Sequence, residues 1–60
     1  MFEIGDTVKV IATGAVGRIK GWHEGSGMYL VEFNNNFRTR EWLADYELKL
    51  TKRKRSEPTH

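Results

Sequence analysis

The chain has 60 residues, of which 38% are hydrophobic and 30% are charged, and it contains no cysteine. A single domain of this length buries only about 60% of the surface that its unfolded form exposes, so a thin core is expected. The lack of cysteine excludes disulfides, thiolate metal ligands and cysteine nucleophiles. Residues 1–20 carry Glu3 and Asp6 and lack the apolar core of a secretory signal, and no apolar run is long enough for a membrane span. We therefore expect a small cytoplasmic domain.

Charge is divided unevenly along the chain. Residues 1–48 hold five basic and seven acidic residues, a net charge of −2, whereas residues 49–60 hold five basic residues and one acidic residue, a net charge of +4. The overall excess of +2 therefore comes from the C-terminal segment. Residues 51–60 are polar and contain Pro58, so they offer too little apolar surface to offset the entropy of ordering. They are predicted to form a disordered basic tail.

Short β-branched and alternating segments predict an all-β fold. The expected strands are, in chain order, residues 7–12, 15–22, 28–33, 37–43 and 48–50. A glycine-rich loop and a run of three asparagines supply turns between them, and one 3₁₀ turn suits residues 44–47. An open sheet of this size would expose two edges, so residues 1–50 are predicted to close into a small five-stranded barrel.

Alternation within these strands predicts which side chains form the core. The expected core residues are Val8, Val10, Val16, Ile19, Tyr29, Val31, Phe33, Leu43 and Leu48, with contributions from Ile4 and Leu50. Gly17 and Gly21 interrupt the second strand. Glycine inside a strand marks a bulge, a sharp barrel corner or the close approach of another backbone.

Four segments resemble a known architecture. The runs Gly5–Val10, Gly14–Ile19 and Tyr29–Phe33, followed by Asp45-Tyr46-Glu47-Leu48, look like an SH3-like barrel, and the resemblance covers residues 3–50. The stretch Gly14–Ile19 is similar to the KOW motif of ribosomal and NusG-type transcription factors, in which a glycine-containing turn lets the first hairpin approach RNA or protein. The resemblance implies a fold more than a function, because such barrels bind RNA, DNA, peptides or other subunits.

A narrower resemblance points to an enzyme. Gly17–Trp22, followed by Tyr29–Glu32, is similar to the plasmid-borne type II dihydrofolate reductases, which are SH3-like barrels that work as tetramers. Their active-site sequence Val-Gln-Ile-Tyr-Pro corresponds here to Arg40-Glu41-Trp42-Leu43-Ala44, which matches it at no position. The Gln and Tyr that contact folate and the nicotinamide cofactor in that family are therefore absent, and the shared segment is interpreted as scaffold.

Residues suited to catalysis or metal binding are sparse. His23 lies in the glycine-rich loop beside Glu24, and His60 ends the tail. A metal site normally needs three or four ligands at defined spacing, which these histidines do not provide. Ser26 and Ser56 lie in the loop and in the tail, where turn or linker roles are expected. We predict no catalytic residues, no metal and no cofactor.

A repeated triad is the most specific functional pattern. The predicted second strand reads Arg18-x-Lys20-x-Trp22, and the predicted fourth strand reads Arg38-x-Arg40-x-Trp42. Alternate residues of a strand share a face, and in a meander these two strands would flank the third. Both triads would then display two cations and one Trp on either side of Met28, Leu30 and Glu32. Cations for phosphates and aromatic rings for bases are typical of single-strand nucleic-acid surfaces.

The predicted function is therefore a non-enzymatic module that binds nucleic acid, RNA or DNA, or a protein of a nucleic-acid machine. Its expected binding residues are Arg18, Lys20, Trp22, Arg38, Arg40 and Trp42, with Lys52, Arg53, Lys54 and Arg55 as an auxiliary arm. An adaptor that binds an acidic protein partner without nucleic acid is one alternative. An oligomeric enzyme similar to the type II dihydrofolate reductases is the other alternative. Among partners, a second copy of the chain is left open as well. At the triads, the structural alternative is a Trp that plugs the barrel, or a bulge near Gly21 or Glu41 that reverses the register.

Overall fold

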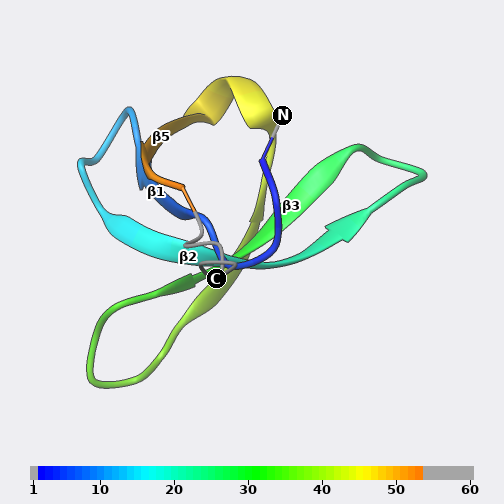
Figure 1. Ribbon diagram of the computed structural model, residues 1–60. Coiled ribbons are helices and arrows are strands. Elements are labelled where there is room, and N and C mark those ends of the chain that lie inside the picture. The colour runs from blue at the N-terminus through cyan, green and yellow to red at the C-terminus, as the bar shows by residue number, and fades with distance from the viewer. Residues whose placement is uncertain (1, 54–60) are drawn as a thin grey trace, which may run out of the picture.

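The computed structural model describes residues 2–53, which form one five-stranded antiparallel sheet (Figure 1). The strands are β1 (Thr7–Val10), β2 (Val16–His23), β3 (Met28–Phe33), β4 (Arg40–Leu43) and β5 (Leu48–Lys52), with the 3₁₀ turn η1 (Asp45–Glu47) before β5. They pair in the order β4-β3-β2-β1-β5, so β2 and β4 flank β3 as predicted. The all-β fold and the 3₁₀ turn are confirmed, whereas the sheet of the described residues is not closed: β4 and β5 remain its edges. Within this part of the chain no helix is long and apolar enough to cross a membrane.

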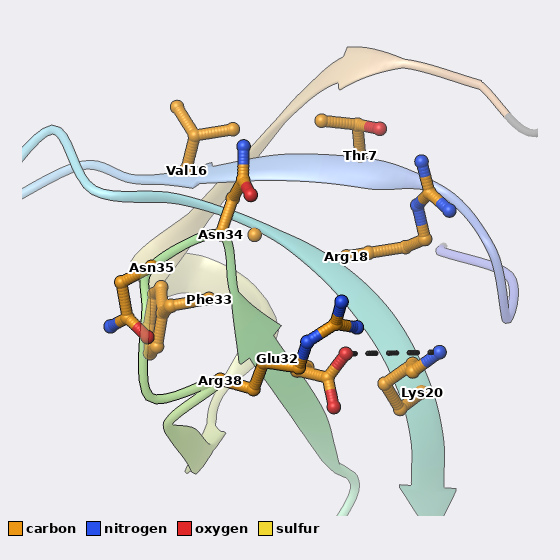
Figure 2. Close-up of a pocket in the computed structure, with 10 residues that line it drawn as sticks. Thr7, Val16, Arg18, Lys20, Glu32, Phe33, Asn34, Asn35 and Arg38 are labelled. Atoms are coloured by element: carbon orange, nitrogen blue, oxygen red, sulfur yellow. Dashed lines mark ion pairs between the residues drawn. The ribbon is translucent and has the colours of Figure 1, made fainter.

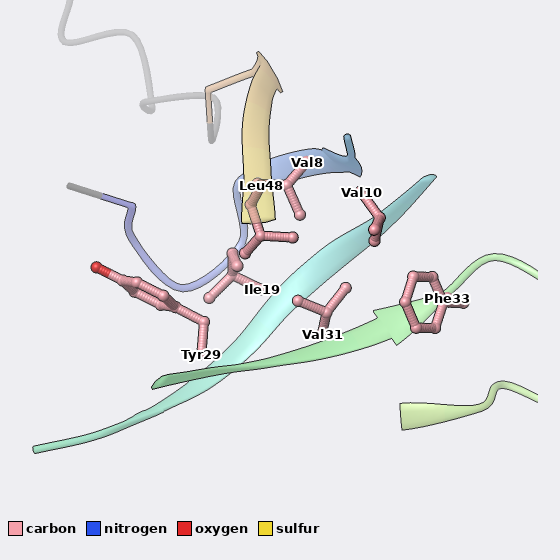
Figure 3. Close-up of a cluster of buried hydrophobic side chains, with 7 residues drawn as sticks. All are labelled: Val8, Val10, Ile19, Tyr29, Val31, Phe33 and Leu48. Atoms are coloured by element: carbon pink, nitrogen blue, oxygen red, sulfur yellow. The ribbon is translucent and has the colours of Figure 1, made fainter. Parts of the chain in front are cut away.

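One face of the sheet carries the hydrophobic core. The alternation of β3 turns three of its side chains toward this face, and β1, β2 and β5 supply the others: Val8, Val10, Ile19, Tyr29, Val31, Phe33 and Leu48. The sheet curls, so that β1 and β5 lie across β2 and β3 with the buried side chains between them (Figure 3). All seven belong to the predicted core.

Two predicted core residues are exposed. Val16 lies opposite Lys9 in the β1–β2 ladder, which places it on the face away from the core, and Ile4 is exposed before β1. Leu43 and Leu50 pack against the core while remaining partly accessible, as does Phe2. Val16 and Ile19 are three residues apart in β2, so a regular strand turns them to opposite faces, and the burial of Ile19 leaves Val16 outside.

A turn at the start of the described chain buries a carboxylate. Asp6 is fully buried, and its Oδ2 accepts a hydrogen bond of 2.9 Å from the backbone N–H of Glu3. Gly5 adopts φ 99°, a left-handed conformation that glycine takes without steric cost. The guanidinium of Arg53 lies 3.8 Å from Asp6 Oδ2 and 3.9 Å from Glu3 Oε2, so the chain beyond β5 returns to this turn.

The last strand is longer than predicted. Residues 51 and 52 belong to β5, and the register places Lys52 opposite Thr7 of β1. The hydroxyl of Thr51 donates a hydrogen bond of 3.0 Å to the carbonyl oxygen of Thr7. The predicted boundary of a disordered tail at residue 51 is therefore wrong by two residues, because pairing with β1 satisfies the backbone of a polar segment. Residues 54–60, the rest of that predicted tail, lie outside the described residues.

Candidate ligand-binding face

The sheet face opposite the core, called the outer face below, collects basic side chains from four of the five strands. Residues directly opposite each other in an antiparallel ladder point to the same side of a sheet. The register therefore forms one row across the outer face, with a residue from each strand: Arg40, Glu32, Arg18, Thr7 and Lys52. Beside it, Val16, Lys9 and Lys49 form a second row on β2, β1 and β5.

Acidic residues lie almost entirely elsewhere. Glu41 pairs with Val31 and so projects from the core-side face of β4, while Asp45 and Glu47 belong to η1. Glu24 lies in the β2–β3 loop, which leaves Glu32 as the one carboxylate in the two rows. The net charge of −2 in residues 1–48 thus hides an excess of cations on the outer face.

Glu32 is shared by several cations. Its Oε2 accepts a hydrogen bond of 2.9 Å from Arg40 Nε, and its Oε1 lies 3.9 Å from Lys20 Nζ. The hydrogen bond from Arg40, together with the positive charges of Arg40, Lys20 and Arg38, holds the pKa of Glu32 below its usual value, against a smaller opposing effect of desolvation. The carboxylate therefore stays ionised and holds cationic side chains on the outer face.

A concavity of about 310 Å³ opens on this face beside Glu32 (Figure 2). Three cationic side chains, one carboxylate and several neutral hydrogen-bonding groups line it, namely Arg18, Lys20, Arg38, Glu32, Thr7, Asn34 and Asn35. The cations outnumber the carboxylate, and guanidinium, hydroxyl and amide groups all donate hydrogen bonds. The lining therefore suits an anion, such as a phosphate group.

A β-bulge divides the first predicted triad. Ile19 pairs with Val31 and Gly21 pairs with Leu30, so Lys20 is the extra residue of β2. The bulge reverses the alternation beyond it, and Trp22 lies opposite Tyr29 on the core-side face with ring centroids 6.5 Å apart. The prediction that Trp22 shares a face with Arg18 and Lys20 is wrong for this reason. With 48% of its surface exposed, Trp22 covers the edge of the core.

The second predicted triad is brought together only in part. Arg40 lies opposite Glu32 and Trp42 opposite Leu30, so both project from the outer face as predicted. Trp42 is 50% exposed, and its ring meets His23 edge-on with centroids 6.1 Å apart. The predicted fourth strand starts too early, because β4 begins at Arg40 and Arg38 has φ 50° in the preceding loop. Arg38 nevertheless lines the concavity.

One aromatic side chain was not singled out by the sequence. Phe37 was expected at the start of a strand, yet it lies in the β3–β4 loop with 89% of its surface exposed. The signal available in the sequence was its position directly after three asparagines, which predict a turn. Lys9 and Lys49 were also missed. Alternation within each strand turns them away from the core, but only the pairing of β1 with β5 places the two lysines opposite each other.

The basic arm is described only at its beginning. Lys52 ends β5 on the outer face, whereas Arg53 lies against Glu3 and Asp6. Lys54 and Arg55 lie outside the described residues.

Residues 2–53 do not assemble a cluster of metal-ligating side chains. No group of three or more His, Cys, Asp or Glu side chains could hold a metal ion there. His23 Nδ1 accepts a hydrogen bond of 3.1 Å from the backbone N–H of Ser26, which gives this histidine a role in shaping the β2–β3 loop. No protein-family model, curated protein or solved structure matches the chain, so its own geometry has to carry the functional interpretation.

Proposed function

We propose that this chain is an SH3-like, KOW-like binding module that contacts nucleic acid through its outer face. The strand order β4-β3-β2-β1-β5 and the single 3₁₀ turn before β5 support this fold class. No residue of the proposed site is assigned a catalytic role.

The observation that carries the proposal is the excess of cationic side chains on the outer face. Arg18, Lys20, Arg38 and Arg40 surround one carboxylate, and β1 and β5 extend the basic surface with further lysines. Affinity for nucleic acid comes largely from neutralising phosphates with such side chains, and each neutralised phosphate releases condensed counterions. A domain with a negative net charge in residues 1–48 can therefore still attract a polyanion on one side.

The outer face also carries an aromatic ring on which a base can stack, as nucleic-acid-binding surfaces commonly do. Trp42 lies two residues beyond Arg40 along β4 and is half exposed, so a base can reach its ring while the backbone follows the cations. Charge rather than apolar area dominates the outer face, which favours a polyanion over an apolar peptide.

The salt dependence of oligonucleotide binding tests the proposal. For the parent chain and for Arg18→Gln, affinity for a fluorescent 12-nucleotide strand is measured by anisotropy at several salt concentrations. Arg53→Gln is the matched control. The sequence assigns Arg53 to the auxiliary arm, but in the structure its guanidinium is engaged by Glu3 and Asp6 and it is no member of the rows on the outer face. Arg18→Gln should weaken binding and reduce the salt slope by about one unit, because one phosphate fewer is neutralised, while Arg53→Gln should do neither.

Two results would contradict the proposal. Binding that shows no dependence on salt would exclude phosphate recognition. An equal fall in affinity for both variants would mean that net charge, and not the outer face, determines binding. A thermal melt of each variant accompanies the titrations, so that unfolding is not mistaken for the removal of a binding group.

A further inference from the structure

The β3–β4 loop holds its tip in one conformation through the side chain of Asn35. Asn35 Oδ1 accepts hydrogen bonds from the backbone N–H groups of Phe37, at 3.1 Å, and of Thr39, at 3.2 Å. The backbone N–H of Arg38 donates a hydrogen bond to the carbonyl oxygen of Asn35 at 3.2 Å. The backbone N–H of Phe33 donates one to the carbonyl oxygen of Thr39 at 2.7 Å, which joins the two ends of the loop. These bonds satisfy the loop backbone internally, which fixes the direction of its tip.

The backbone of Arg38 indicates that this conformation is imposed. Its φ of 50° lies in the left-handed region, which a non-glycine residue adopts only when its surroundings fix it. The consequence of that conformation is that the side chain of Arg38 reaches the concavity beside Glu32 (Figure 2). The loop thus accepts local strain and places a cation at the site.

Phe37 directly precedes this arginine and makes little contact with the fold. Its side chain is 89% exposed, so burial does not explain why the loop presents an aromatic ring. Asn34, Asn35 and Arg38 of the same loop line the concavity, and Phe37 directly precedes Arg38 in the chain. The hydrogen-bonded loop therefore presents an exposed aromatic residue directly before a cation of the concavity.

We propose that Phe37 is a stacking platform for an unpaired base, and that the ligand of the outer face is single-stranded nucleic acid. This inference rests on the proposed function and narrows its ligand class. An exposed ring can stack only on a base whose face is free, whereas bases in a duplex already stack on each other. The fixed loop has already given up the freedom that binding would otherwise have to remove, which favours affinity.

A second aromatic ring lies at the other end of the same basic surface. Along β4, the loop with Phe37 comes before Arg40, and Trp42 comes after it. Phe37 and Trp42 therefore flank Arg40 along the chain, and Arg40 belongs to the row that contains Glu32 and Arg18. A strand that follows β4 across the outer face would stack a base on each ring and pass its phosphates over the cations between them.

Three kinds of probe, each of 12 nucleotides and so with the same number of internucleotide phosphates, test the inference by fluorescence anisotropy: a single strand in its DNA and RNA forms, an abasic strand, and a hairpin duplex. Phe37→Ala is compared with Tyr46→Ala, which removes another exposed aromatic ring from η1. Phe37→Ala should lower affinity for the single strands by about tenfold, within the range for the loss of one stacked base, and leave binding to the abasic strand unchanged. Tyr46→Ala should change none of these affinities, and Phe37→Trp should retain the parent affinity.

The outcomes separate this inference from the proposed function. If the parent binds all three probes equally, or if Phe37→Ala binds the single strands as well as the parent does, stacking is refuted while phosphate binding by the outer face stands. If the parent binds none of the probes in a salt-dependent way, both proposals fall. A loss that affects the abasic strand as much as the single strands would instead show that Phe37 supports the loop, which also overturns the stacking role.

Discussion

Replacement of Gly17 by alanine should destabilise the fold, because a single methyl group has no space there. A Cβ atom at this position would lie 2.6 Å from Val31 Cγ1 and 2.8 Å from the carbonyl oxygen of Glu32. Both distances are well below ordinary contact, and one of the two atoms belongs to the backbone of β3. Relief of the clash requires β2 and β3 to separate next to Val31, which is fully buried.

The expected loss follows from the cost of overpacking, about 1–3 kcal/mol. A 60-residue domain has a total stability of roughly 3–9 kcal/mol at the usual value per residue, so the variant loses a large part of it. For a domain of 60 to 100 residues, each kcal/mol lowers the melting temperature by about 4–8 °C. Gly17→Val adds two methyl groups at the same place and should be less stable than Gly17→Ala.

Gly21→Ala is the matched control in the same strand. A Cβ atom there would meet Leu30 Cβ at 3.7 Å, which is an ordinary van der Waals contact. Thermal melts of the parent, Gly17→Ala and Gly21→Ala should therefore place only the Gly17 variant several degrees below the parent. Equal melting temperatures for the two variants would refute this argument. They would show that the general effect of replacing a glycine, and not the close approach of β3 to Gly17, determines the loss of stability.

Two further predictions follow from the outer face and from the bulge. The lowered pKa of Glu32 means that the folded protein favours the ionised carboxylate, so its stabilisation is present above the ordinary glutamate pKa near 4.3 and is lost as pH falls through the lower folded value. The melting temperature of Glu32→Gln should accordingly fall less than that of the parent between about pH 6 and pH 3, and parallel curves would contradict the assignment. Trp22→Ala should cost about 1.5–2.5 kcal/mol in chemical denaturation, half the loss for a fully buried aromatic residue, because Trp22 covers Tyr29 with half of its surface exposed. The Trp22→Ala variant should leave oligonucleotide affinity unchanged. If it folds as well as the parent but binds oligonucleotides more weakly, Trp22 belongs to the binding surface and not to the edge of the core.

The strands and core could be predicted from the sequence wherever alternation is strong and local. Met28–Phe33 alternates without interruption, and its predicted bounds and buried face are both correct. Short strands bounded by glycine and asparagine also gave the meander, because tight turns force neighbouring strands to pair. The pairing of β1 with β5 brings Thr7 against Lys52, a long-range contact that no local pattern indicates.

The candidate site was less predictable. The face to which a strand residue points alternates along the chain, so one extra residue in the strand reverses the face of every residue beyond it. Gly21 marked the region in which a bulge was considered, yet the sequence does not say whether Lys20 is paired or extra. That single choice decides the side on which Trp22 lies. Arg38 shows the same limit, since alternation was extended through a residue whose left-handed conformation is fixed by the side chain of Asn35.

The row of Arg40, Glu32, Arg18, Thr7 and Lys52 takes one residue from every strand, and its β1 and β5 members are 45 positions apart in the chain. The row cannot be complete until the last strand has been synthesised. During synthesis, residues 7–43 can pair among themselves, but β5 can close the row only after Lys52 has left the ribosome. The complete row is thus a late product of folding, because its last member takes its place only when β5 pairs with β1.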